Sequence, residues 1–264
     1  MIIPFYLIIL LNISFYTLLL TGAVIFIRML QKKMINLLGL VLFFILYALQ
    51  TNPPPFLPEY LTMNFVFISL FSLAFFIKYT FYRGRKSAFP YVIAALVIFR
   101  GLQIILKVIF QFQPGFVYPS NSAEIPFFFM YIIVVALQEL ILMIWYSISV
   151  FRSFNNFRKL GIRKWIKVRY LMVGISTIIF SIDTSLSILL VINDIGVFLF
   201  LIYASIINIL LFTTVNVVAW VIPFKSLLYF MKKETRQSLE DVSESEIMAK
   251  VKSELPVDKS SGNP

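Results

Sequence analysis

Seven apolar segments follow one another along the 264-residue chain, and most are about twenty residues long. Roughly twenty residues of helix cross the hydrocarbon layer of a bilayer. Because lipid cannot hydrogen-bond the backbone, each segment must satisfy its own N–H and C=O groups as an α-helix. We therefore predict an all-α, polytopic membrane protein with seven transmembrane helices. They lie at 3–27, 34–50, 61–79, 89–110, 126–150, 170–192 and 196–222.

The composition supports burial in a membrane. Hydrophobic residues make up 60% of the chain and charged residues 13%, whereas soluble domains carry roughly a quarter charged residues. A soluble fold could not cover so much apolar side-chain surface.

Basic residues alternate between the two sides of the predicted bundle. Apart from Arg100 and Lys107, all of the 23 Lys and Arg residues fall in alternate connections, at the adjoining helix ends or in the C-terminal tail. The connections 51–60, 111–125 and 193–195 contain none. Positive charge stays on the cytoplasmic side during insertion, so we predict an N-terminus outside and a C-terminus in the cytoplasm. The expected location is a plasma membrane.

The connection 152–169 is especially basic. Its interleaved aromatic residues could stack on nucleic acid, but its place between two predicted helices favours anionic lipid headgroups, at about 1 kcal/mol for each Lys or Arg. Docking of an acidic cytosolic protein is the alternative, and we expect no nucleic-acid partner. The candidate contact residues are Arg152, Arg158, Lys159, Arg163, Lys164, Lys167 and Arg169.

The C-terminal tail forms a second predicted region. Residues 1–230 make up the seven-helix bundle, and residues 231–264 make up a cytoplasmic tail. In the tail, Ser243 and Glu246 form a capping box for a short amphipathic helix over about 243–255. We expect the residues after this helix to be disordered.

Cysteine and histidine are both absent. The chain therefore has no disulfide, no thiolate nucleophile and no imidazole base or metal ligand. A glycine-rich phosphate loop is missing as well. We expect no enzymatic activity, no metal and no cofactor.

Four charged side chains fall inside the predicted helices at a distance from the cytoplasmic helix ends. Arg100 and Lys107 lie in the fourth segment, Glu139 in the fifth and Asp183 in the sixth. Helix rise places Arg100, Glu139 and Asp183 roughly 16 to 20 Å from the cytoplasmic ends of their helices, near the bilayer centre. The spacing of Arg100, Gln103 and Lys107 puts them on one helix face. A lone charge at this depth costs about 3 to more than 10 kcal/mol, so these faces must point at one another or at water.

Three interpretations of this polar centre stay open. Arg100 can form a structural ion pair with Glu139 or Asp183 that fixes the helix register. Alternatively, Arg100, Gln103 and Lys107 bind a small anionic or polar ligand in a cavity open to the outside, and the two carboxylates hold them in place. The third interpretation is a proton or cation path through the carboxylates.

Two stretches near the end of the bundle carry a family resemblance: RYLMVGISTIIFSID opens the sixth segment and AWVIPFKSL closes the seventh. Over its last third the chain resembles the seven-helix sensory input regions of prokaryotic membrane receptors. The resemblance implies a receptor or sensor that relays an outer or membrane signal, through the basic connection and the tail, to a separate cytosolic or membrane partner. Two alternatives remain: a transporter or channel for an anionic or polar solute, and a non-catalytic subunit of a membrane complex.

Overall fold

The computed structural model describes residues 5–51, 59–110, 125–159, 164–186, 189 and 195–221. Contacts divide the chain into two units, Met1–Val221 and Ile222–Pro264. The predicted domain boundary at 230–231 and the predicted tail helix lie outside the described residues.

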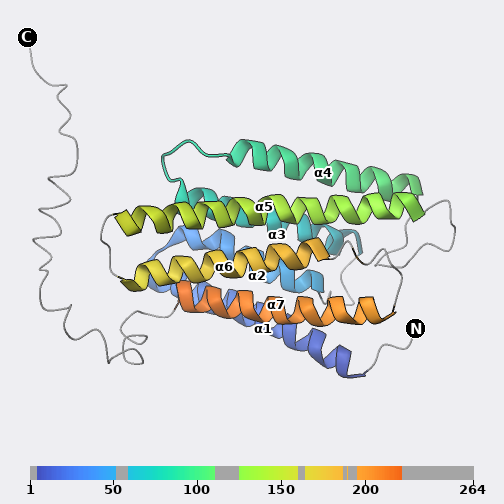
Figure 1. Cartoon of the computed structure of the whole chain (residues 1–264), viewed down its shortest axis with the longest axis horizontal. Coiled ribbons are helices and arrows are strands. Elements are labelled where there is room, and N and C mark those ends of the chain that lie inside the picture. The colour runs from blue at the N-terminus through green and yellow to red at the C-terminus, as the bar shows by residue number, and fades with distance from the viewer. Residues whose placement is uncertain are drawn as a thin grey trace, which may run out of the picture. The chain divides into compact units, whose positions relative to one another are not determined.

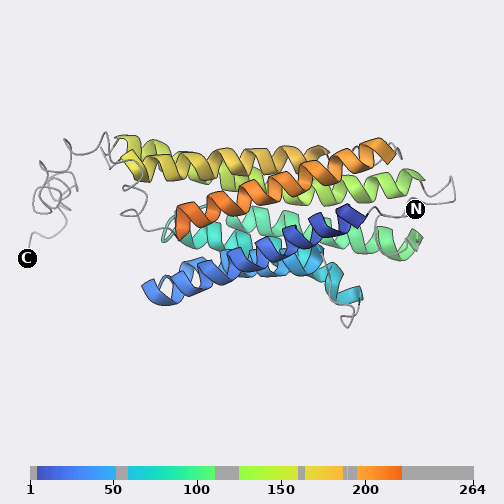
Figure 2. The ribbon, with the colours of Figure 1, turned by 90° about the horizontal axis from the view of Figure 1, so that it is seen from below.

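Every regular element in the described ranges is helical, which confirms the all-α fold class (Figure 1). The helices run alongside one another, and each reverses the direction of the one before it (Figures 1 and 2). The elements are α1 (Phe5–Lys32), the short 3₁₀ helix η1 (Ile35–Leu37), α2 (Leu38–Thr51), α3 (Glu59–Phe81), α4 (Phe89–Phe110), α5 (Ile125–Lys159), α6 (Lys164–Leu186) and α7 (Ile195–Trp220).

Five of these helices contain a stretch long and apolar enough to cross a membrane. The stretches are Asn12–Lys32, Asn64–Phe81, Phe89–Ile109, Ile125–Lys159 and Leu199–Trp220. The helix over Ile35–Thr51 is apolar but shorter, and α6 carries several basic residues at its start. Membrane crossing by α2 and α6, which the count of seven requires, stays a prediction.

The helix α5 has 35 residues and continues to Lys159, past the predicted end at residue 150. No glycine or proline occurs between Pro126 and Gly161, so nothing in the backbone ends the helix where the apolar run ends. This corrects the prediction of a basic loop over 152–169. Arg152, Arg158 and Lys159 lie on α5, Lys164, Lys167 and Arg169 lie on α6, and Arg163 lies outside the described residues.

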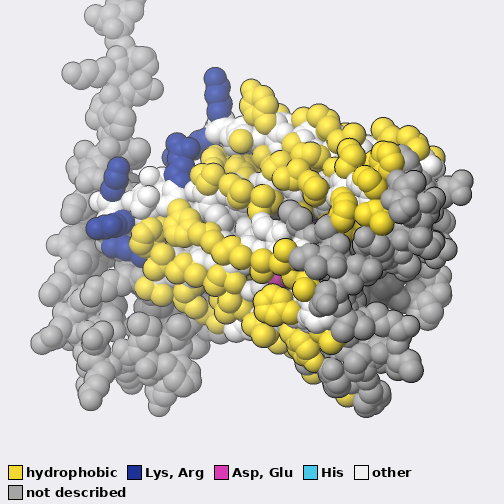
Figure 3. All heavy atoms as spheres, turned by 45° about the vertical axis from the view of Figure 1, so that its right-hand side comes forward, with side chains coloured by type: hydrophobic (Ala, Val, Ile, Leu, Met, Phe, Trp, Pro, Cys, Tyr) yellow, Lys and Arg dark blue, Asp and Glu magenta, His cyan; other side chains and the backbone are white. Residues whose placement is uncertain are grey.

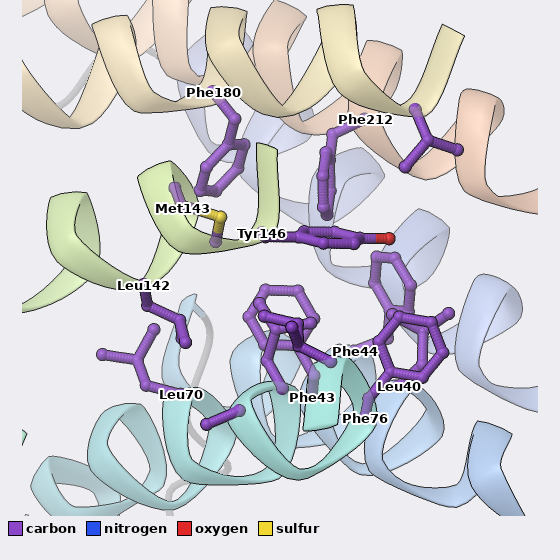
Figure 4. Close-up of a cluster of buried hydrophobic side chains, with 14 of the residues drawn as sticks. Leu40, Phe43, Phe44, Leu70, Phe76, Leu142, Met143, Tyr146, Phe180 and Phe212 are labelled. Atoms are coloured by element: carbon purple, nitrogen blue, oxygen red, sulfur yellow. The ribbon is translucent and has the colours of Figure 1, made fainter. Parts of the chain in front are cut away.

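An aromatic core joins both halves of the bundle. The ring centroid of Phe212 on α7 lies 5.9 Å from that of Phe44 on α2 and 4.9 Å from that of Phe180 on α6. In Figure 4 Tyr146 of α5 lies between Phe180 and Phe212 on one side and Phe44 and Phe76 on the other, and its ring centroid is 5.9 Å from that of Phe76 of α3. Such ring pairs add stabilisation beyond the area that they bury.

Small residues let neighbouring helices approach closely. A Cβ atom on Gly39 of α2 would overlap the Ser72 carbonyl oxygen of α3 and would lie 2.9 Å from the Phe76 amide nitrogen. Close backbone approach of this kind is typical of helix packing in membranes. At the other side of the bundle α1 also contacts α7, so the first and last described helices are neighbours.

The surface of the bundle is apolar, whereas several polar side chains are buried inside it. Leu20, Val108 and Ile207 are all more than 60% exposed, while Thr177 and Thr213 are fully buried. Soluble proteins rarely expose apolar patches above a few hundred Å². Figure 3 shows hydrophobic side chains over most of the described part of one face and Lys and Arg side chains gathered at one end. This distribution fits a protein embedded in a membrane.

We call that end the basic end. It is formed by the last turns of α1, α3 and α5, by the first turns of α6 and by the short connections next to them. Its described residues are Arg28, Lys32, Lys33, Lys78, Arg83, Arg85, Lys86, Arg152, Arg158, Lys159, Lys167 and Arg169.

Candidate functional site

Arg100 lies in the middle of α4 and is partly buried. Its Nη2 donates a hydrogen bond of 2.7 Å to Oδ1 of Asn64 on α3, and its Nη1 donates one of 3.0 Å to Oε1 of Gln103. Its Nε is buried and has no hydrogen-bond partner among the described residues. The Tyr131 phenol on α5 also lies within electrostatic range of the guanidinium. Arg100 therefore connects α3, α4 and α5.

The hydrogen bonds continue from α4 into α5. Gln103 is 4% exposed, and its Nε2 donates to Oε1 of Gln138 at 2.5 Å. Gln138 is 1% exposed and donates back to the Leu96 carbonyl oxygen of α4 at 3.5 Å. We call this set the amide network. It consists of Asn64, Arg100, Gln103 and Gln138.

The ion pair predicted between Arg100 and Glu139 or Asp183 is not formed. Among the described residues the guanidinium donates to two amide oxygens and to no carboxylate. The physical reason is helix rotation, because consecutive residues point about 100° apart around a helix. Gln138 points at α4, and Glu139, the next residue, points elsewhere. Amide oxygens can satisfy guanidinium donors without neutralising the charge.

The two carboxylates, Glu139 on α5 and Asp183 on α6, take no part in the hydrogen bonds given above for the amide network. Glu139 and Asp183 are each only 9% exposed. Both lie within electrostatic range of the buried Tyr47 hydroxyl group on α2. Ser205 and Asn208 of α7 form side-chain hydrogen bonds with the Asp183 carboxyl group. We call this set the acid cluster. It consists of Tyr47, Glu139, Asp183, Ser205 and Asn208.

One oxygen of the acid cluster lacks a partner. Oδ1 of Asp183 is buried and accepts no hydrogen bond in the described part of the chain. A buried acceptor of this kind is costly unless a proton, a water molecule or a cation satisfies it. Carboxyl groups can take up a proton or an alkali cation, so the acid cluster is the part of this centre that can change its charge.

Lys107 and Gln103 share a face of α4 with Arg100, as predicted from their spacing, but their burial differs. Gln103 is buried, whereas Lys107 is partly exposed. Lys107 lies two turns beyond Arg100, or about 10 Å by helix rise. Arg100 and Gln103 therefore lie deeper along α4 than Lys107.

Several members of both sets were not predicted from the sequence: Asn64, Gln138, Tyr47, Ser205 and Asn208. A polar residue inside an apolar segment was the available signal for each of them. They received no weight because uncharged residues are less costly in lipid than charged ones. Gln138 in particular stands directly before Glu139 and shares its depth.

The predicted basic contact residues separate into exposed and partly buried ones. Arg152, Arg158 and Lys159 are exposed on α5, while Lys167 and Arg169 on α6 are partly buried. Arg169 donates a 3.2 Å hydrogen bond from Nη1 to the Ala219 carbonyl oxygen of α7. Burial and the neighbouring charge of Arg28 both lower the pKa of Arg169, but a guanidinium remains charged because its ordinary pKa is so high.

No family model, curated protein or solved structure matches the chain. Within the described residues no three His, Cys, Asp or Glu side chains come together as metal ligands would. A functional assignment must therefore rest on the amide network, the acid cluster and the basic end.

Proposed function

We propose that the protein is a receptor-like or sensor-like seven-helix protein of a prokaryotic plasma membrane, with its N-terminus outside and its tail in the cytoplasm. The gathering of Lys and Arg at one end of the bundle supports this orientation, because positive charge is retained on the cytoplasmic side. The basic end is then the side from which a signal passes to a separate partner.

The observation that carries the proposal is the position of α5. Two consecutive residues of α5, Gln138 and Glu139, belong to the amide network and to the acid cluster respectively. The same helix then continues without interruption to Lys159 at the basic end. A change of charge at Glu139 or Asp183 alters the interactions on one side of α5, and a rigid helix carries the displacement to its far end.

This mechanism needs two arrangements of α5 whose populations a signal can shift. In one, both carboxyl groups are ionised and repel each other; in the other, a proton or a small polar ligand neutralises one of them. Helix displacements of about 1–2 Å are typical of such transitions at packed interfaces. The basic end would present a different surface to its partner in each arrangement.

The test measures the distance between α5 and the α3–α4 connection at the basic end. The chain contains no cysteine, so Lys159→Cys and Arg83→Cys can carry spin labels without further changes, and both positions are exposed. Pulsed electron paramagnetic resonance in lipid nanodiscs then compares the labelled parent with Glu139→Gln and Asp183→Asn. Ser176→Ala is the matched control, because its buried hydroxyl bonds only to the Val173 carbonyl oxygen of its own helix.

We expect the two acid variants to shift the mean distance by about 2 Å, and the Ser176→Ala control to leave it unchanged. An unchanged distance in both acid variants, over the pH range in which the protein stays folded, would show that the acid cluster is a static packing feature. The sensor proposal would then fail.

A second candidate, a transporter, is favoured by one observation. Oδ1 of Asp183 has no hydrogen-bond partner among the described residues, and a buried carboxylate oxygen of this kind can bind a proton or a cation. The transported species would then be a proton or a cation, rather than the anionic or polar solute considered from the sequence. Uptake driven by an ion gradient into proteoliposomes, lost in Asp183→Asn and kept in Ser176→Ala, would favour transport over sensing.

A further inference from the structure

A groove of about 660 Å³ opens on the surface between α5 and α6, which lie side by side (Figure 1). It is separate from the amide network and the acid cluster. Three of the lining residues are serines, whose small side chains fill little of the space between the helices. They are Ser147 on α5 and Ser181 and Ser185 on α6. The Phe151 ring of α5 packs directly against Gly174 of α6, where a Cβ atom would lie 2.8 Å from the ring.

Most of the groove is lined by apolar side chains that also face outward. Ile144 and Ile148 of α5 are 45% and 56% exposed, and Ile178 and Ile182 of α6 are 41% and 55% exposed. In a membrane this part of the surface meets acyl chains. An apolar hollow of this kind takes a hydrocarbon chain in preference to water, because water finds few hydrogen-bond partners there.

The end of the groove toward the basic end is polar. Arg152, Asn155 and Asn156 line it, and all three are exposed. Arg152 lies about 6 Å beyond Ile148 along the helix axis. In α5 the apolar lining therefore gives way to hydrogen-bond donors over little more than one turn. A membrane lipid shows the same change where its acyl chains meet the glycerol and the phosphate.

A second, independent feature points to a bound ligand. Ser147 lines the groove and is only 7% exposed, yet its Oγ has no hydrogen-bond partner in the described part of the chain. The other two serines of the groove differ, since Ser181 bonds to the Thr177 carbonyl oxygen and Ser185 to that of Ser181. Ser147 lies about 7.5 Å from Arg152 along the axis, so a ligand with a phosphate at Arg152 can place an acceptor oxygen near Ser147.

We propose that this groove is a specific binding site for one anionic glycerophospholipid. One acyl chain lies against Ile144, Ile148, Ile178 and Ile182. An ester carbonyl oxygen accepts a hydrogen bond from Ser147. The phosphate contacts the Arg152 guanidinium, with the amides of Asn155 and Asn156 beside it. The site requires a membrane but does not depend on whether the protein acts as a sensor.

Charge favours a lipid over a second copy of the chain as the occupant. Two parallel copies packed along α5 and α6 would bring their basic ends together, including Arg152 and Arg158 of each, and like charges at close range oppose association. An anionic headgroup meets the same residues with attraction. Each Lys or Arg near an anionic membrane surface contributes about 1 kcal/mol.

The test counts bound lipids by native mass spectrometry of the full chain released from detergent micelles. Phosphatidylglycerol is the anionic probe, phosphatidylcholine is the zwitterionic control, and soluble glycerol phosphate tests for binding of a headgroup without acyl chains. We expect one phosphatidylglycerol to bind more tightly than phosphatidylcholine, and glycerol phosphate not to compete.

Two pairs of variants test the site. Arg152→Ala should weaken phosphatidylglycerol binding about fivefold and remove the preference over phosphatidylcholine. Arg158→Ala, an exposed residue of the same helix that does not line the groove, should change neither. Ile148→Trp should weaken binding of both lipids by filling the groove. Ile98→Trp, on the exposed surface of α4, should not.

Three outcomes would overturn the proposal. Equal losses in Arg152→Ala and Arg158→Ala would show that the basic end attracts lipid without a defined site. Unchanged binding in both Arg152→Ala and Ile148→Trp would place the lipid elsewhere. A dimer that Ile148→Trp dissociates while lipid binding persists would assign the groove to a second copy. All these positions are exposed, so the variants are expected to fold, and circular dichroism checks their helix content.

Discussion

Arg100 shows how a charged side chain can be accommodated inside an apolar helix bundle. A guanidinium next to a carboxylate forms a pair without net charge, whereas Arg100 keeps its charge and binds the amide oxygens of Asn64 and Gln103. Hydrogen bonds to a charged group are stronger than those between neutral groups. The arrangement leaves the carboxylates of Glu139 and Asp183 available for the acid cluster instead of using them as counterions.

The bond between Gln103 and Gln138 can be tested by a double-mutant cycle. Gln103→Leu and Gln138→Leu should each lower the free energy of unfolding by about 1 kcal/mol, since each leaves a buried amide group without its partner. The double variant should lose less than the sum, with a coupling energy of about 0.6 kcal/mol, the average for polar pairs between membrane helices. Unfolding in mixed micelles with increasing dodecyl sulfate measures all four proteins.

The control cycle combines Gln103→Leu with Ser153→Ala, whose hydroxyl bonds to the Ser149 carbonyl oxygen of its own helix far from the network. This pair should be additive. Additivity in the Gln103 and Gln138 pair as well would show that the two amides do not interact across α4 and α5.

At the scale of the helices, Gly39 lies at a close contact between two helices, whereas Gly101 does not. Gly39→Ala should lower the free energy of unfolding by about 1–3 kcal/mol, because the new methyl group meets the α3 backbone. Gly101→Ala is the matched control. A Cβ atom there meets nothing within 4 Å, so alanine should raise stability by up to about 1 kcal/mol through its higher helix propensity. Equal effects of the two variants would contradict the close contact of α2 and α3.

The extension of α5 past residue 150 gives a second prediction for a helix. Spin labels placed singly at residues 150–159 should show mobility that repeats about every 3.6 residues. A label at Phe157, whose ring lies 4.9 Å from that of Tyr170, should be restricted, and labels at the exposed Asn156 and Arg158 should be mobile. Uniformly high mobility across 150–159 would instead support the loop expected from the sequence.

The helices themselves were predictable, because an apolar run of about twenty residues has one stable backbone conformation in lipid. The C-terminal end of α5 was not predictable. The hydropathy pattern marks only the part of a helix that lies in the membrane, whereas the helix itself continues beyond it. The partner of Arg100 was also unpredictable. It depends on how α3, α4 and α5 are rotated against one another, and no pattern within a single helix contains that angle. Glu139, Asp183 and Gln103 were found as buried polar residues, but with different partners from those expected.

At the scale of the whole molecule, the distribution of basic residues predicts the orientation in the membrane. A single cysteine at Arg85, in the exposed connection after α3, should be protected in intact cells from a maleimide that cannot cross membranes. A cysteine at Gly196, exposed at the start of α7 at the opposite end, should react. Permeabilised cells provide the control in which both react, and the reverse pattern in intact cells would overturn the proposed topology.

The contact between α1 and α7 has a consequence for how the bundle is made. The ribosome delivers α1 to the membrane first and α7 last. The two helices can therefore pack against each other only after the intervening helices have been inserted. Until then α1 can pack on α2, but the side that α7 will cover remains open to lipid. A nascent chain halted before α7 would therefore hold Asp183 without Ser205 and Asn208, and the acid cluster is completed in the final step of assembly.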